Sequence, residues 1–225
     1  SIYNEYLTMQ LSKFLATYFY ITEELCQTLS IDEETLSEWQ QSSLFPKPSY
    51  CLQSQLECSS YSGIYQCEEY QDYYPRGAAS WGQLIIKHDI TSSCQAFNYF
   101  AQQYSNHLSK LAEQGFAINE ELFGSEIEEH LQQVWQQFLC SKYGVLTQNG
   151  LVEEAVQLDV AKLLIDDITE LRTKIGLTLE ERQSLHKALK LMNRALSYGT
   201  GNEGKNTLRH RYIDNVVTKY DLSIK

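Results

Sequence analysis

The residues whose spacing best suits metal chemistry are Glu126, Glu129 and His130. Positions four apart on a helix lie on the same face, so Glu126 and His130 would point in the same direction. Such pairs hold metal ions in helical bundles when other helices supply matching ligands. No second Glu-x-x-His is present in the sequence. We therefore interpret the set as a solvated acidic helix face and predict no bound metal.

Six cysteines could supply thiolates: Cys26, Cys51, Cys58, Cys67, Cys94 and Cys140. Structural zinc sites usually contain two cysteines about two to four residues apart, and this sequence has no Cys-x-x-Cys. Residues 1–20 lack the apolar core of a secretory signal, and no apolar run is long enough to cross a membrane. These observations predict a cytoplasmic protein with reduced thiols and no membrane contact.

A glycine-rich segment, residues 199–205, satisfies the pattern Gly-x-Gly-x-x-Gly. A phosphate-binding loop of this kind follows a strand and opens a helix. The residues before Gly199 have the apolar period of a helix instead. We interpret the segment as a connection between helices and predict no cofactor.

Amphipathic helices must position most of these side chains. Apolar residues at three- and four-residue spacings predict helices at residues 2–20, 80–88, 91–114, 118–141, 151–174, 178–198 and 206–220, with two short helices inside residues 22–41. With three prolines and eleven glycines in 225 residues, few breaks interrupt this pattern. The sequence therefore predicts an all-α fold.

Two short helices near the N-terminus form a recognisable pattern within residues 21–48. The spacing resembles the MerR-like and excisionase-like helix-turn-helix, and the matching residues are Leu25, Ile31, Thr35, Leu36, Trp39, Leu44 and Pro46. Packing explains the pattern, since two helices joined by a tight turn bury such side chains against each other. The resemblance implies a degenerate helix-turn-helix module packed on a multi-helix body.

Charge argues against DNA as the partner of this module. The chain has a formal net charge of −11. Residues 21–50 contain six acidic side chains and only Lys47 as a base, and Ser37 lies where DNA-binding members commonly carry Arg. Phosphate contacts need nearby cations. We predict that the module packs against the body or a protein partner and that nucleic acid is not its ligand.

Residues 51–80 have no clear period and contain many Tyr, Ser, Gln and Cys residues. We interpret them as an ordered connection between residues 1–50, the N-terminal helix with the helix-turn-helix-like module, and residues 81–225, the helical body. Long connections in compact domains are often functional. The candidate ligand- or partner-binding residues are Tyr50, Tyr73, Tyr74, Trp81, Tyr143, Arg209 and Arg211. No catalytic residue is predicted.

The order of several short segments resembles an uncharacterised bacterial family of unknown function that carries the name natural product biosynthesis protein. The segments are Pro48-Ser49-Tyr50, Tyr73-Tyr74-Pro75 with Trp81, Phe138-Leu139 with Tyr143-Gly144-Val145, and Arg209-x-Arg211-Tyr212-Ile213-Asp214 with Tyr220. This resemblance implies a place in the biosynthesis of a specialised metabolite. It supplies no catalytic residues.

We therefore expect a non-catalytic accessory or regulatory protein that acts through a protein partner, with homo-oligomers also possible. Two alternatives stay open at this stage. A transcriptional regulator would bind DNA through the helix-turn-helix-like module. An enzyme or small-ligand binder would build its pocket from the Tyr-rich connection, Trp81, Arg209 and Arg211.

Overall fold

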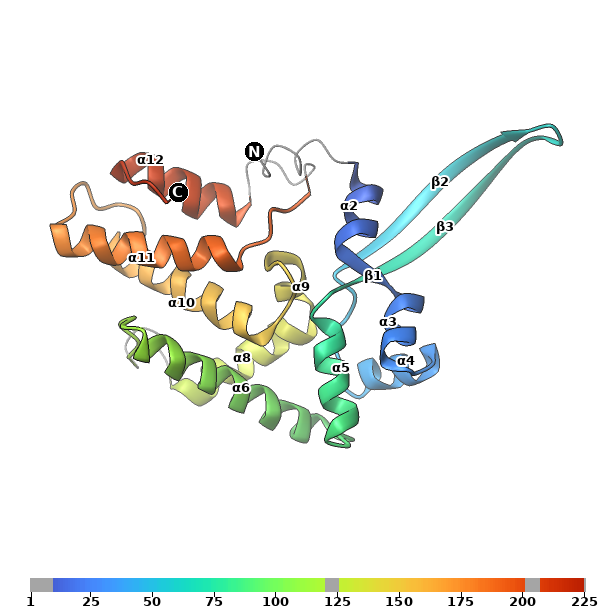
Figure 1. The fold of residues 1–225 in the computed structure, drawn as a ribbon, viewed down its shortest axis with the longest axis horizontal. Helices are drawn as coiled ribbons and strands as arrows, with labels where there is room; N and C mark the ends of the chain where they lie inside the picture. Colours follow the sequence, from blue (N-terminus) through green and yellow to red (C-terminus); the bar gives the residue numbers. More distant parts are fainter. Residues whose placement is uncertain (1–9, 120–125, 201–206, 225) are drawn as a thin grey trace.

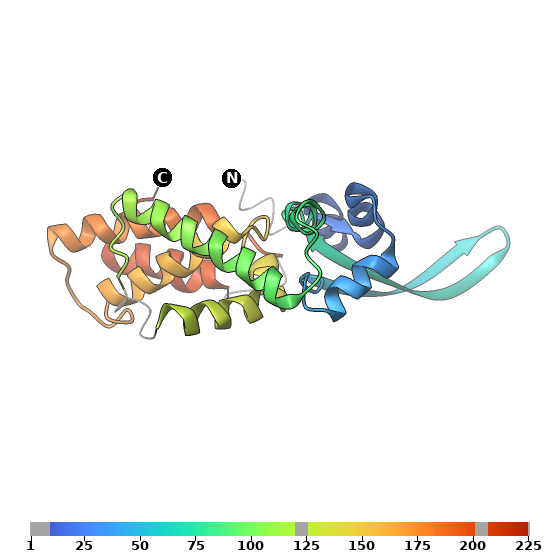
Figure 2. The same cartoon turned by 90° about the horizontal axis from the view of Figure 1, so that it is seen from below.

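The computed structural model describes residues 10–119, 126–200 and 207–224. The molecule is elongated (Figures 1 and 2). A bundle of helices occupies one end, and a long β-hairpin projects alone from the other. Parts of four predictions lie outside the described residues: the helices at residues 2–20, 118–141 and 206–220 and the glycine-rich connection at residues 199–205.

The first elements of the described chain are three helices and a short strand. These are α2 (Leu11–Tyr18), β1 (Phe19–Ile21), α3 (Thr22–Leu29) and α4 (Glu33–Gln41). The Asp32 carboxylate accepts the backbone N–H of Thr35 at 2.8 Å and so caps α4. The two short helices predicted within residues 22–41 are confirmed.

A three-stranded antiparallel sheet follows, and it makes the all-α prediction wrong. Strands β2 (Tyr50–Ser60) and β3 (Gly63–Pro75) form the hairpin, and β1 joins the outer edge of β3 at its base, giving the order β1-β3-β2. Strands with one buried face alternate apolar and polar residues. Most of this hairpin is exposed on both faces, so its sequence lacks the alternation by which strands are found. We name residues 11–75 the N-terminal module.

The rest of the chain is helical. Its elements are α5 (Ala78–Lys87), α6 (Ser93–Glu113), α8 (Ile127–Leu139), α9 (Lys142–Leu146), α10 (Val152–Ile168), α11 (Leu179–Ala195), the π-helical turn η2 (Arg209–Asp214) and α12 (Asn215–Tyr220). Helix α10 is the centre of this body because it packs against both α6 and α11. Its side chains are buried around most of its circumference.

Local backbone conformations explain where two predicted helices end early. The helix predicted at residues 151–174 ends at Ile168 because Glu170, Leu171 and Arg172 adopt left-handed conformations, with φ of 48°, 57° and 70°. The helix predicted to reach residue 141 ends at Leu139, and Ser141 is left-handed with φ of 64°. A left-handed residue cannot continue a right-handed helix.

One main hydrophobic core runs from the N-terminal module into the helical body. It includes side chains of α3, α4 and α5 together with those of α6, α8, α10 and α11. A smaller cluster lies under α2 and consists of Phe14, Leu15, Phe19 and Tyr73. Within the described ranges, no helix is long and apolar enough to cross a membrane.

Candidate functional site

The most exposed feature of the fold is the outer part of the hairpin. Strands β2 and β3 pair without interruption from Tyr50–Tyr73 to Ser60–Gly63, so no bulge bends the ribbon. Strand β1 reaches only as far as Tyr73 on β3. Beyond the Tyr50–Tyr73 pair the ribbon therefore has two strands only (Figures 1 and 2). We name residues 53–70 the arm.

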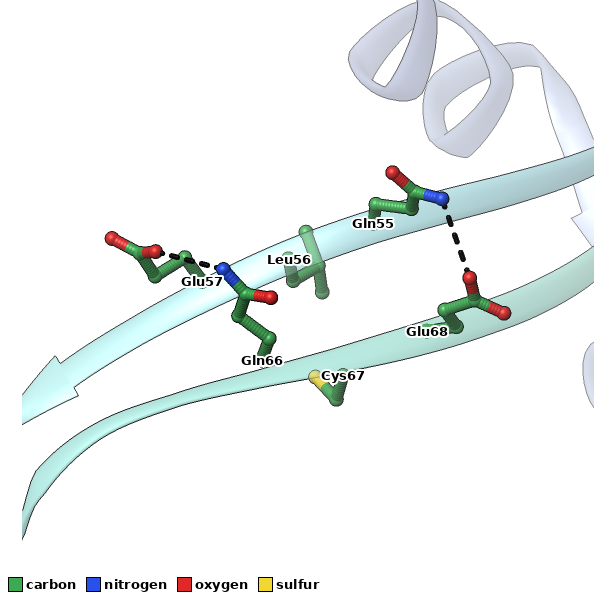
Figure 3. Close-up of a pocket in the computed structure, with 6 residues that line it drawn as sticks. All are labelled: Gln55, Leu56, Glu57, Gln66, Cys67 and Glu68. Atoms are coloured by element: carbon green, nitrogen blue, oxygen red, sulfur yellow. Dashed lines mark hydrogen bonds between the residues drawn. The ribbon is translucent and has the colours of Figure 1, made fainter.

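One face of the arm is polar and held by its own hydrogen bonds. Residues directly opposite each other in an antiparallel pair point to the same face. On this face Gln55 donates to Glu68 at 3.3 Å and Gln66 donates to Glu57 at 3.2 Å (Figure 3). Tyr70 also donates to Glu68, at 2.9 Å. We call this the polar face of the arm.

The opposite face exposes Leu56 and Tyr65, while Ile64 and Tyr70 are exposed on the polar face. Leu56 lies opposite Cys67, and Cys58 lies opposite Tyr65. The exposed fractions of Leu56 and Tyr65 are 42% and 57%. The sole charged side chain on this face of the arm is Glu69, opposite Ser54. We call this the apolar face of the arm.

The apolar face is an outward continuation of the small core under α2. Tyr73 is buried in that core, and Tyr50 and Leu52 pack against it. Side chains two positions apart on a strand point to the same face. Tyr50 and Leu52 are therefore on the face of Leu56, and Tyr73 is on the face of Cys67, which pairs with Leu56. In the described part of the chain, helix α2 covers the base of this face and no element covers the arm itself (Figure 1).

The curved ribbon also encloses a shallow open hollow of about 440 Å³. Its walls are two facing stretches of the arm, residues 55–57 and 66–68 (Figure 3). Carboxylates and amides dominate its lining, with Leu56 and Cys67 between them. An open hollow on a ribbon suits contact with another protein surface better than enclosure of a small ligand.

Negative charge is concentrated in the N-terminal module. Residues 11–75 contain ten acidic side chains but only Lys13 and Lys47 as bases, a net charge of −8 out of −11 for the chain. The arm has three Glu and no Lys or Arg. Helix α4 has three Glu, all exposed, and no Lys or Arg. The surface of this module therefore repels phosphate.

Four of the seven predicted site residues lie near the base of the hairpin, and three of these are buried. Tyr73, Tyr74 and Trp81 are at most 7% exposed, and Tyr50 is half-buried against Phe19. The Tyr74 hydroxyl oxygen accepts the Gln40 side-chain N–H at 2.9 Å. Burial raises the pKa of Tyr74 to about 12, although this hydrogen bond acts in the opposite direction.

The other three predicted residues lie apart from the hairpin. Tyr143 is fully buried in the body. The Arg209 guanidinium is buried, donates to Asn193 and to the Leu196 carbonyl, and lies 4.6 Å from the Tyr198 ring centroid. Arg211 is exposed on η2. The structure thus places the seven residues in separate regions, and their binding role stays a prediction.

A second polar arrangement, which the sequence did not reveal as a unit, lies between four helices of the body. Tyr104 of α6 and Tyr143 of α9 both donate to the Asp159 carboxylate of α10, at 2.7 and 2.8 Å. Burial raises the pKa of Asp159, and the two hydroxyl donors oppose that shift. His130 of α8 lies 3.3 Å from the Tyr104 hydroxyl. We call these four residues the Tyr–Asp network.

The Tyr–Asp network also accounts for the histidine considered as a metal ligand. Because Tyr104 gives its hydroxyl hydrogen to Asp159, His130 Nε2 is assigned as the donor to Tyr104. Among the described residues, no group of three or more His, Cys, Asp or Glu side chains has the arrangement of a metal site. All six cysteines are free thiols. Glu126 is the N-cap residue of α8.

We expect His130 to make stability depend on pH. Burial, followed by the charge of Lys142, lowers the pKa of His130 below its ordinary value of 6.5. The unfolded chain therefore takes up this proton first, and stability is lost as the pH falls from about 6.5 through the lower pKa of the folded state. In His130→Gln, the melting temperature should fall less than in wild type between about pH 7.5 and pH 5.5. An unchanged slope would contradict this assignment.

Comparison with known proteins concerns the helical body. Residues 96–221 match the family described as "Family of unknown function (DUF6058)", and this range is more than half of the chain. The chain belongs to this family. The DUF6058 match begins within α6 and ends just after α12, so it contains the Tyr–Asp network and leaves out the arm. No curated protein and no solved structure matches the chain.

Sequence reasoning missed the arm for an identifiable reason. Its strands have Gln, Ser and Glu at positions where a half-buried strand would have apolar residues. Two signals could have found it. Tyr is enriched in strands, and the stretch Ser60-Tyr61-Ser62-Gly63 ends in a glycine whose φ of +122° lies in the region that favours glycine.

Proposed function

We propose that this member of the DUF6058 family is a non-catalytic accessory or regulatory protein that acts through a protein partner bound by its N-terminal module. The observation that carries the proposal is the arm, a two-stranded ribbon with an exposed apolar face and no cation. Exposed apolar surface rimmed by polar residues marks protein interaction sites. The resemblance seen in the sequence adds natural-product biosynthesis as the setting, which stays a prediction.

Charge favours protein over DNA as the ligand. The order of elements, two short helices joined by a turn and then a hairpin, is compatible with the helix-turn-helix interpretation. In DNA-binding modules of that kind the second helix enters the major groove. Here that helix is α4, whose exposed charges are Glu33, Glu34 and Glu38. We propose that the module keeps its shape for binding protein.

Shortening the arm should remove the partner and leave the fold intact. Hydrogen-bonded and non-hydrogen-bonded pairs alternate along an antiparallel ribbon. Ser54 is six positions from Ser60, so the Ser54–Glu69 pair is of the same type as the Ser60–Gly63 pair at the native turn. Replacing residues 55–68 by Asn-Gly therefore closes the hairpin with a two-residue turn in the native register. The tagged wild-type chain, purified from its source cells, should recover one protein in near-equal amount. The short-arm variant should lose about 90% of it or more.

Two results would contradict the proposal. A wild-type chain that purifies alone would exclude a stable partner. A salt-sensitive gel shift of the DNA upstream of its own gene would favour a transcriptional regulator. The control is chemical unfolding of the short-arm variant, whose unfolding free energy should stay within about 1 kcal/mol of wild type because the arm buries little surface.

A further inference from the structure

We infer that the apolar face of the arm docks on a partner protein whose contact surface is an apolar strip with a Lys or Arg placed opposite Glu69. This inference rests on the proposed function and specifies the chemistry of the partner.

The apolar face is the side of the arm that a partner can cover at the smaller cost. An isolated two-stranded hairpin is marginally stable in water, and a third strand or a packed face stabilises it. On the polar face, Glu57 and Glu68 already accept hydrogen bonds from glutamines across the ribbon. The apolar face exposes Leu56 and Tyr65 and continues the core under α2, while Ile64 and Tyr70 are exposed beside the two carboxylates of the polar face. Covering either face removes apolar surface from water, but covering the polar face would dehydrate two carboxylates and covering the apolar face only one.

Glu69 sets the charge of the partner. It lies on the apolar face between the Leu52–Gln71 and Leu56–Cys67 pairs. Among the described residues, no hydrogen bond or ion pair of its side chain is seen, in contrast to neighbouring Glu68, which is bonded to Gln55 and Tyr70. A surface that covers Leu56 also takes Glu69 out of water. A carboxylate enclosed in this way needs a cation, and a planar guanidinium suits it best.

A second copy of this chain cannot provide that cation from the same surface. The arm contains no Lys or Arg, and the whole module has a net charge of −8. Two arms packed face to face would enclose two carboxylates without partners and bring two acidic modules together. A basic partner would be attracted by the same charges, which would raise the rate of encounter and orient the two proteins.

The arm offers matched pairs of residues for testing which face docks. Tyr65 lies on the apolar face and Tyr70 on the polar face, and both are exposed. The photoreactive residue p-benzoylphenylalanine would replace each in turn in the full chain, with Ser37 of α4 as a third position. After irradiation of the source cells, mass spectrometry would identify the attached peptide. Glu69→Gln and Glu68→Gln, which remove one charge from opposite faces, would each be combined with the reactive residue at 65.

We expect crosslinking from position 65 and not from 70, to a peptide that contains Lys or Arg. Glu69→Gln should lower the yield about tenfold or more, as for an enclosed charge, and Glu68→Gln should change it less than about twofold. Crosslinking from 70, or from 37 alone, would overturn the inference and leave the proposed function standing. Equal effects of the two Gln variants, or a second copy of this chain crosslinked at 65, would also overturn it. If no position gave a crosslink and the wild-type chain purified alone, both this inference and the proposed function would be contradicted.

Discussion

Replacing Trp81 by alanine is expected to lower the free energy of unfolding by about 3–5 kcal/mol. The Trp81 ring is 5% exposed, and its centroid lies 5.1 Å from that of Phe138 and 5.9 Å from that of Trp135. Its indole N–H donates to the Leu44 carbonyl at 2.8 Å. Alanine would leave a cavity where α5 meets α8 and would leave that carbonyl without its donor.

Urea unfolding at neutral pH measures this loss, and two further variants separate its causes. Trp81→Phe keeps an aromatic ring but removes the N–H, so it should cost less than alanine, about 1–3 kcal/mol. Trp39→Ala removes a half-buried tryptophan from α4 and should also cost less. A Trp81→Ala chain of wild-type stability would count against a structural role and return Trp81 to the list of ligand-binding candidates.

Asp159→Ala is expected to cost a similar amount, about 3–5 kcal/mol, for a different reason. The hydroxyls of Tyr104 and Tyr143 both donate to this carboxylate. Both tyrosines are fully buried. Without the carboxylate, Tyr104 has no acceptor, and Tyr143 keeps only the Gln137 side-chain oxygen at 3.2 Å. A buried hydroxyl without an acceptor costs about 1–3 kcal/mol, and the hydrogen bonds to a charged group are lost as well.

Removing the hydroxyls of Tyr104 and Tyr143 as well should restore part of the lost stability. In the triple variant Asp159→Ala, Tyr104→Phe, Tyr143→Phe, neither buried hydroxyl remains, and only the half-buried His130 N–H loses its acceptor. The chain should therefore be more stable than Asp159→Ala alone. Asp167→Ala is the matched control, because Asp167 is exposed on the same helix and should change stability by about 0.5 kcal/mol or less. If the triple variant were the least stable of the set, the hydroxyl–carboxylate account would be wrong.

The helices could be predicted from the sequence because most of them bury one stripe of apolar side chains. The short helices α3 and α4 and the longer α6 and α11 all lie within the predicted ranges, and α5 begins two residues before its predicted range. Helix α10 is buried around most of its surface, yet its length and apolar content still indicated a helix. The errors lie at helix ends, where single left-handed residues such as Ser141 decide the outcome.

The Tyr–Asp network could not be predicted, for a topological reason. Tyr104 belonged to an expected apolar stripe, and Asp159 was one acidic residue among several on an expected helix. Their contact joins residues 55 positions apart and depends on how α6 packs against α10. A single sequence gives the period of a helix and the identity of its buried face, but it does not give the neighbour of that face.

The two-stranded arm also affects how any complex forms and dissociates. Backbone amides of a ribbon without a third strand open to water at a small fraction of the global unfolding energy, so residues 53–70 should exchange hydrogen for deuterium long before α10 does. A partner that closes on the apolar face has to suppress this opening, and the cost of doing so is subtracted from its affinity. The interaction is therefore expected to be reversible, and protection of the arm amides would report the bound fraction directly.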